Sequence, residues 1–117
     1  MKKIYYLSTC DTCRRILKEL HPLDGFLLQD IKTEAITNTQ LDEMKNLSGS
    51  FESLFSKRAR LYKERGLGKQ PLAENDFRKL ILEHYTFLKR PVILFNDKIF
   101  IGNSKKVIEA AKKTLHF

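Results

Sequence analysis

Two cysteines stand in the segment Cys10-Asp11-Thr12-Cys13, and they are the only cysteines of the chain. A disulfide between them would close too short a loop to restrict the unfolded chain much, so a purely structural bridge is not expected. A Cys-x-x-Cys pair where a strand gives way to a helix is typical of redox chemistry, because the unpaired amides and the dipole of the helix stabilise a thiolate.

The two thiols are expected to have different roles. Cys10 precedes the apolar face of the helix and should be the exposed nucleophile, whereas Cys13 lies on that face and should be the protected thiol that resolves a mixed disulfide. The charges of Arg14 and Arg15 favour a thiolate at Cys10, and Asp11 opposes it. We predict that the pKa of Cys10 is lowered on balance.

The cysteine pair has two alternative interpretations. It could be half of a zinc site, but such a site needs four ligands, and the other candidates, His21, His84 and His116, lack partner spacing. We therefore expect no metal and no bound cofactor. A pair of inert buried thiols is the second alternative.

Arg58 is the first arginine that could assist the thiols. A helix is predicted to follow Ser50, and on it Arg58 falls between Leu54 and Tyr62 on the apolar side. A guanidinium that faces inward needs an anionic partner or hydrogen bonds. A structural salt bridge, for example to Asp30, or a side chain that reaches out to solvent explains the position equally well.

Arg90-Pro91 opens a strand that should face the first one. In the fold that the order of strands and helices predicts, a proline at this place is cis and lies beside the active cysteine, where it shapes the groove in which a partner docks; without the fold, the sequence does not favour a cis bond. His84, near a helix end, is expected to be a core or capping histidine. The basic residues between 57 and 69 should mostly be a solvated helix face, so direct nucleic acid binding is not expected.

The elements that position these residues follow from the hydrophobic pattern. They are a strand over 3–7, a helix ending near 20, a strand over 26–31, three helices between 37 and 88, a hairpin of strands over 92–95 and 99–101, and a helix that begins after Ser104. This order predicts an α/β fold with a thioredoxin-like (glutaredoxin-like) core and a mixed four-stranded sheet. We expect one domain, 1–117, with the core at 1–34 and 88–117 and a three-helix insertion at 35–87.

Composition limits the class of protein. The chain has 117 residues, of which 42% are hydrophobic, and no apolar run long enough for a membrane span. Its apolar start is interrupted at Ser8, which argues against a signal peptide, so we expect a cytoplasmic protein. The net charge of +8 is compatible with anionic ligands, acidic protein surfaces, nucleic acid or a simply solvated surface.

Several segments together resemble a known family. They are residues 5–14 with Cys-x-x-Cys-Arg, Asp30-Ile31, residues 56–59, residues 88–93 with Arg-Pro-Val-Ile, and Ile101-Gly102. In this order they resemble the ArsC and Spx family of arsenate-reductase-like proteins over essentially the whole chain. The resemblance implies the thioredoxin-like core with a helical insertion, and it implies that Cys10 is the catalytic cysteine.

The resemblance also assigns the arginines. Arg58 and Arg90 match two of three arginines that arsenate reductases use to hold an oxyanion and the reacting thiolate. Gly102 stands in place of the third, and Cys13 stands where those enzymes have serine. Each lost charge-assisted hydrogen bond weakens an anion site by roughly 1.5 to 3 kcal/mol. Both differences resemble the Spx branch, whose members bind the C-terminal domain of the RNA polymerase α subunit and use Cys-x-x-Cys as a redox switch.

Two functions follow. The first is an arsenate-reductase-like oxidoreductase, in which Cys10 attacks an oxyanion such as arsenate or a disulfide, and Cys13, glutathione or a glutaredoxin resolves the intermediate. The residues assigned to this site are Cys10, Cys13, Arg58 and Arg90, with Arg14 and Pro91 along the substrate groove. The alternative is a redox-sensing regulator that binds the RNA polymerase α subunit.

Overall fold

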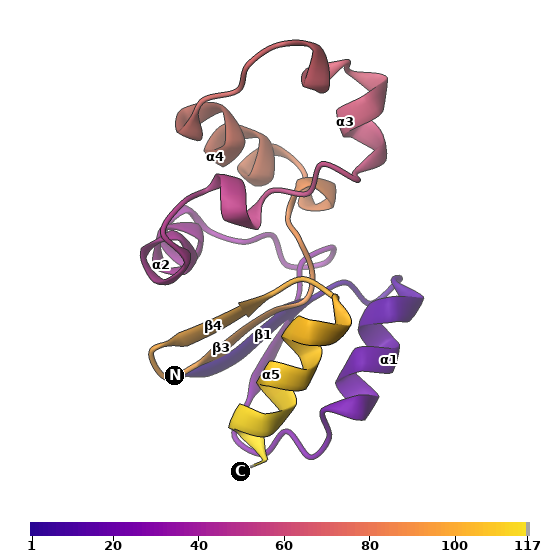
Figure 1. Ribbon diagram of the computed structural model, residues 1–117, viewed down its shortest axis with the longest axis vertical. Coiled ribbons are helices and arrows are strands. Elements are labelled where there is room, and N and C mark those ends of the chain that lie inside the picture. Colours follow the sequence, from indigo (N-terminus) through magenta and orange to yellow (C-terminus); the bar gives the residue numbers. More distant parts are fainter. Residues whose placement is uncertain (117) are drawn as a thin grey trace. The chain divides into compact units, whose positions relative to one another are not determined.

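A four-stranded sheet forms the frame of the computed structural model, which describes residues 1–116 (Figure 1). Its strands are β1 (Lys2–Tyr6), β2 (Leu27–Asp30), β3 (Val92–Phe95) and β4 (Lys98–Ile101), in the spatial order β2-β1-β3-β4. β1 pairs parallel with β2 and antiparallel with β3, and β3 pairs antiparallel with β4. The predicted mixed four-stranded sheet is confirmed.

Two helices, α1 (Asp11–Glu19) and α5 (Lys105–Leu115), pack on one face of this sheet (Figure 1). The buried side chains between them and the sheet are Ile4, Ile16, Leu20, Ile93, Ile108 and Ala111. Because α1 follows β1 within a few residues and leads back to the parallel strand β2, its first turn lies at the carboxyl end of β1. The hydroxyl of Ser104 accepts the amide hydrogen of Val107 at 3.2 Å, which confirms the predicted start of α5.

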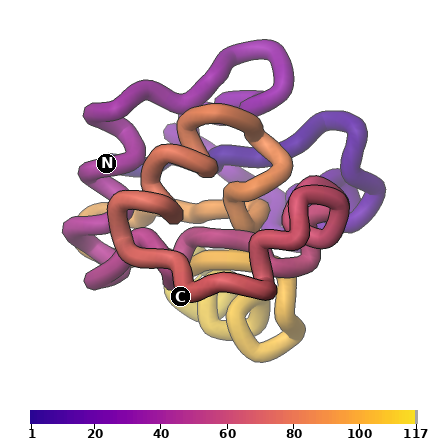
Figure 2. Tube along the Cα trace, turned by 90° about the horizontal axis from the view of Figure 1, so that it is seen from above, coloured from indigo at the N-terminus to yellow at the C-terminus, as the bar shows by residue number. Residues whose placement is uncertain are grey.

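The chain forms two compact units by internal contacts. The first holds Met1–Glu34 and the residues from Arg90 onward, and the second is Ala35–Lys89. The second unit contains α2 (Asn38–Ser48), α3 (Arg60–Glu64) and α4 (Glu74–Glu83), with 3-10 turns η1 (Glu52–Leu54), η2 (Leu67–Lys69) and η3 (Tyr85–Phe87). Figure 2 follows this segment from purple to orange, and short helical turns alternate with extended stretches along it.

Local signals account for the helix ends of the second unit. Thr37 and Gln40 form the predicted capping box, in which each side chain accepts the backbone amide hydrogen of the other at 3.0 Å. Gly49 ends α2 with a φ of +96°, a conformation that few residues other than glycine adopt. The Nδ1 atom of His84 accepts the amide hydrogen of Thr86 at 3.0 Å, so this histidine caps η3, as predicted.

The helix predicted around Arg58 is wrong. The hydroxyl of Ser50 accepts the amide hydrogen of Ser53 at 3.1 Å, but only the short turn η1 follows, and the chain is extended at Phe55. The reason is tertiary pairing: the amide of Ser56 donates to Phe87 and the amide of Lys89 donates to Leu54, both at 2.8 Å. The ring of Phe55 stacks on Phe87 with centroids 5.3 Å apart, so its burial is satisfied without a helix.

The described part of the chain, residues 1–116, contains no helix that is both long enough and apolar enough to cross a membrane.

Candidate functional site

Cys10 is the residue that begins α1. It is the N-cap, with extended backbone angles of φ −95° and ψ 114°, and its side chain is half-buried. Its carbonyl oxygen accepts the amide hydrogen of Arg14 at 3.1 Å, the first bond of the helix. No side chain caps the first turn through the N-cap position. The amides of that turn are therefore available to the Cys10 sulfur.

The surroundings of Cys10 stabilise its thiolate. Burial opposes ionisation, but it is outweighed by hydrogen bonds from the amide and the thiol of Cys13, by the positive charge of Arg90 and by the amide of Thr12. The pKa of Cys10 is lowered as a result. The helix start predicted this direction, and the structure adds Arg90 as a source of positive charge.

Cys13 has the opposite character. Its side chain is 0% exposed, and burial raises its pKa to about 11, against a partial lowering by the backbone of Leu7. The charge of Cys10 raises the pKa of Cys13 further. At neutral pH the pair therefore consists of a thiolate-prone Cys10 and a protonated Cys13 that donates to it.

Arg90 and Pro91 lie in the same unit as the thiols, just before β3. The Arg90-Pro91 peptide bond is cis, Pro91 is buried, and Arg90 is half-buried. The positive charge of Arg90 acts on both sulfurs, which it stabilises as thiolates. Of the two arginines assigned to the site, the structure therefore brings Arg90 to the cysteines.

Arg58 does not have the predicted position. It lies in a turn of the second unit, between the extended residue Phe55 and α3, and its side chain is exposed rather than turned into an apolar face. The predicted inward orientation is wrong, because it depended on a helix that does not form. A role of Arg58 in anion binding, and its pairing with Asp30 of the other unit, stay predictions.

Arg14 is exposed on α1 and pairs with Asp11. The two charges that we expected to act on Cys10 in opposite directions therefore compensate each other locally. A place for Arg14 along a substrate groove stays a prediction.

Asp30, at the end of β2, is a polar residue of this region that the sequence interpretation did not assign to the site. One carboxylate oxygen accepts the amide hydrogens of Ser8 and Lys32, each at 3.2 Å. The hydroxyl of Ser8 also binds the carboxylate and is the largest cause of its lowered pKa. A signal was available, because side chains at the carboxyl ends of neighbouring parallel strands meet at one edge of the sheet.

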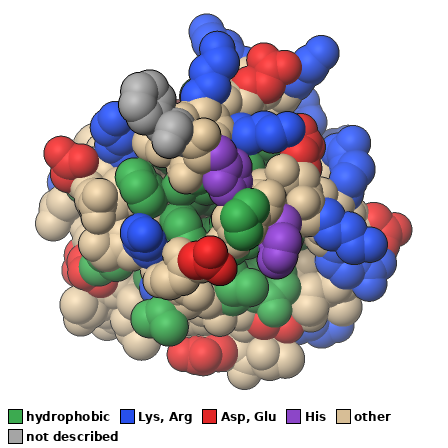
Figure 3. Space-filling view, turned by 90° about the horizontal axis from the view of Figure 1, so that it is seen from below, with side chains coloured by type: hydrophobic (Ala, Val, Ile, Leu, Met, Phe, Trp, Pro, Cys, Tyr) green, Lys and Arg blue, Asp and Glu red, His purple; other side chains and the backbone are tan. Residues whose placement is uncertain are grey.

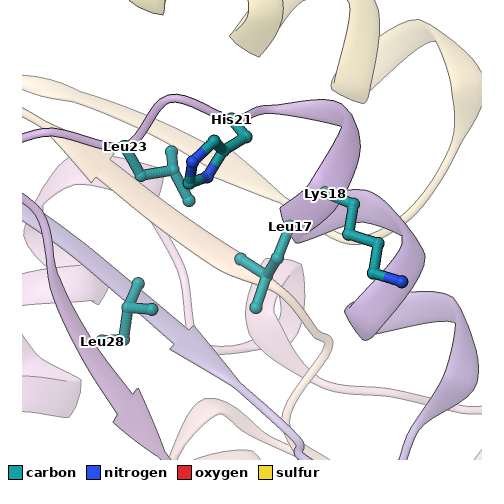
Figure 4. A pocket seen from close by; sticks show the side chains of 5 residues that line it. All are labelled: Leu17, Lys18, His21, Leu23 and Leu28. Carbon is teal, nitrogen blue, oxygen red and sulfur yellow. The ribbon is translucent and has the colours of Figure 1, made fainter.

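An apolar depression lies at the other end of α1. It is lined by Leu17, Lys18, His21, Leu23 and Leu28, as Figure 4 shows. With a rise of about 1.5 Å per residue, Lys18 is about 12 Å along the helix from Cys10. The face drawn in Figure 3 carries hydrophobic side chains near its middle, with basic side chains gathered at its top and right. The depression holds neither thiol, so it is separate from the candidate redox site.

Metal binding has no support from side-chain clusters. Within residues 1–116, no group of three or more His, Cys, Asp or Glu side chains is arranged to hold an ion.

The family of this chain follows from a comparison with models of protein families. A model described as the ArsC family matches residues 5–111. The chain belongs to the ArsC family. The resemblance predicted from the Cys-x-x-Cys-Arg and Arg-Pro-Val-Ile motifs is confirmed.

Similar proteins carry names of two kinds. The Global transcriptional regulator Spx 2 of Bacillus cereus is 27% identical over 109 residues, which are 90% of this chain and 82% of that protein. The solved structure of the arsenate reductase from Vibrio cholerae has a TM-score of 0.72 and 24% identity, over 92% of this chain and 95% of that one. An arsenate reductase (ArsC) related protein from Brucella melitensis has a TM-score of 0.66 and 26% identity, over 93% and 92%. The predicted ArsC-type, thioredoxin-like fold is confirmed.

Proposed function

We propose that this ArsC-family protein is an arsenate-reductase-like thiol-disulfide oxidoreductase that works through Cys10 and Cys13. The observation that carries the proposal is the opposite ionisation of the two thiols, one with a lowered pKa at a helix N-terminus and one buried with a pKa of about 11. This combination supplies an attacking thiolate and a protonated thiol held in reserve next to it.

The reaction begins at Cys10. Its thiolate attacks one sulfur of a substrate disulfide, the substrate S–S bond breaks, and the other half leaves as a thiolate, so that Cys10 is now in a mixed disulfide. The negative charge of Cys10 is lost in this step. Because that charge raises the pKa of Cys13, its loss makes Cys13 easier to deprotonate at the moment when it is needed.

Cys13 completes the cycle. After it loses its proton, its sulfur attacks Cys10, the mixed disulfide breaks, and the second substrate half leaves as a thiolate. The substrate has gained two electrons and the protein has a Cys10-Cys13 disulfide. Two equivalents of glutathione, or one reduced glutaredoxin, would return both thiols, which is the role we propose for these donors.

An oxyanion such as arsenate is the substrate that the family's reductases suggest. Arg90 supports it, because its charge already acts at Cys10. Two features count against a tight anion site: Gly102 stands in place of the third arginine, and Arg58 is exposed in its turn. We therefore propose that disulfides are better substrates than arsenate for this protein.

A redox-sensing regulator is the second candidate function. It is favoured by the similarity to the Global transcriptional regulator Spx 2 over 90% of this chain. In this case the same two thiols would form and break a disulfide as a redox switch, and the partner would be the C-terminal domain of the RNA polymerase α subunit.

A Cys13→Ser variant separates these functions. Without the resolving thiol, any mixed disulfide at Cys10 should persist, so purification after mild oxidation and mass spectrometry of the intact protein identify what is attached. Glutathione or a glutaredoxin on Cys10 supports the enzyme. Co-purification of RNA polymerase without an attached thiol supports the regulator.

The matched control is the double variant Cys10→Ser with Cys13→Ser, which should carry no adduct. An adduct on this control would mean that the attachment is not at Cys10. If the Cys13→Ser protein carries neither an adduct nor RNA polymerase, and Cys10 titrates like free cysteine, both functions are wrong.

A further inference from the structure

The turn that leads from β1 into α1 contacts both thiols. The amide of Cys10 donates to the carbonyl oxygen of Leu7 at 3.1 Å, which closes the turn over residues 7–10. The backbone of Leu7 also binds the sulfur of Cys13. The position of this turn therefore decides how the Cys10 sulfur lies against the first amides of α1.

The middle of the turn is held by one carboxylate. Asp30 accepts the amide hydrogen of Ser8 at 3.2 Å and a further hydrogen bond from the Ser8 hydroxyl. Ser8 and Asp30 are 22 positions apart in the chain, so this contact fastens the turn to a different strand. Within residues 7–10, Ser8 is thus bound through its backbone and its side chain at once.

Asp30 is itself firmly placed. Its carbonyl oxygen accepts the amide hydrogens of Thr33 at 3.2 Å and of Glu34 at 2.8 Å, which closes the turn after β2. The next residue, Ile31, donates to Tyr6 of β1 at 2.9 Å. The carboxylate therefore projects from a fixed point of the sheet, and side chains carried on rigid elements hold their partners most precisely.

We propose that Asp30 is a positioning residue for Cys10, and that its carboxylate holds Ser8 so that the turn presents the Cys10 sulfur to the first amides of α1. The inference deepens the proposed function and rests on it, since it concerns the reactivity of the same thiol. Asp30 acts through Ser8 and has no part in the chemical steps.

The direction in which the pKa of Cys10 changes distinguishes a positioning role of Asp30 from an effect of its charge. Removal of a nearby negative charge would lower the pKa of a thiol, because a carboxylate opposes a second anion. Release of the turn would raise it, because the sulfur would lose its alignment with the amides. A rise in the pKa of Cys10 on removal of Asp30 can therefore come only from lost positioning.

The test uses full-length protein with Cys13→Ser, so that thiolate absorbance in the ultraviolet reports Cys10 alone. Asp30→Ala should raise the pKa of Cys10 and reduce its alkylation by iodoacetamide below that pKa several-fold. Asp30→Asn should keep most of the lowered pKa of Cys10. The backbone amides of Ser8 and Lys32 bind the same carboxylate oxygen, and the side-chain oxygen of asparagine can replace it. Asp24→Ala, in the exposed turn before β2, is the matched control and should titrate like the parent.

Each outcome decides. An Asp30→Ala protein that is folded by circular dichroism and titrates like the parent overturns the inference. So does an Asp30→Asn protein that is impaired as much as Asp30→Ala, because the effect would then not follow the hydrogen bonds. If Asp30→Ala does not fold, the pKa of Cys10 is compared in Asp30→Asn and Ser8→Ala instead. The inference then requires a higher pKa of Cys10 in Ser8→Ala. A parent whose Cys10 titrates like free cysteine would instead contradict the proposed function itself.

Discussion

The two ends of α1 differ in almost every property that matters for chemistry. At the first turn lie a half-buried thiol, the amides that bind its sulfur, the charge of Arg90 and the turn held by Asp30. At the last turn lie the buried side chains Ile16 and Leu20, and beyond them the depression that three leucines line together with Lys18 and His21. One helix thus carries a polar, reactive end and an apolar, structural end.

A hollow in the surface therefore does not mark the reactive site of this protein. The leucines of the depression offer no hydrogen bond to an anion, and neither thiol lines it. Backbone amides and a nearby guanidinium do the opposite at the first turn, with only partial enclosure. The electrostatic surroundings of the sulfur, rather than the volume beside it, identify the site.

Loss of Cys10 should have the largest effect on thiol reactivity. In a Cys10→Ser variant the remaining thiol is 0% exposed, with a pKa of about 11. Alkylation by iodoacetamide at neutral pH should therefore fall at least about a hundredfold. Cys13→Ser should keep most of the rapid reaction. The division of roles between the two thiols would be wrong if both variants lost the same amount.

Removal of Arg90 should have the next largest effect. Arg90→Ala should raise the pKa of Cys10 and slow its alkylation several-fold below that pKa, because a positive charge near the sulfur is lost. Arg90→Lys should retain part of the lowering. Arg60→Ala, at an exposed arginine that is not assigned to the site, is the control, since charges exposed to solvent are screened. An equal rise in both alanine variants would show that the effect is not specific to Arg90.

A change at the apolar end of α1 should have the smallest effect on the thiols. Leu20 is 0% exposed, so Leu20→Ala should lower the free energy of unfolding by about 2–5 kcal/mol in urea titrations. The pKa of Cys10, measured below the unfolding transition, should stay at its parent value. A shift as large as that of Arg90→Ala would mean that the two ends of the helix are not independent.

The parts of the fold with local signals could be predicted from the sequence. The strand Val92–Phe95, the hairpin after it, the Thr37 capping box and the Ser104 cap depend on residues close together in the chain. The Cys-x-x-Cys pair belongs with them, because a helix start is itself local. These features agree with the structure because nothing distant competes with them.

The remainder depends on contacts between distant segments. The spacing of Leu54, Phe55 and Arg58 suits a helix, but the strand-like pairing of residues 54–56 with 87–89 replaces it. Asp30 could not be assigned to Cys10 from spacing alone, because their link requires β1 and β2 to be neighbours. Both differences arise where contacts between distant segments, rather than local propensity, determine the backbone conformation or the neighbours of a side chain.

Titration of Cys10 in the Cys13→Ser protein measures directly whether this thiol ionises at neutral pH. Serine keeps a hydrogen-bond donor at position 13, so the thiolate absorbance reports Cys10 in nearly its native surroundings. We predict a single transition clearly below the value of free cysteine, about 8.5. A transition at or above that value would mean that Cys10 is not the attacking thiolate.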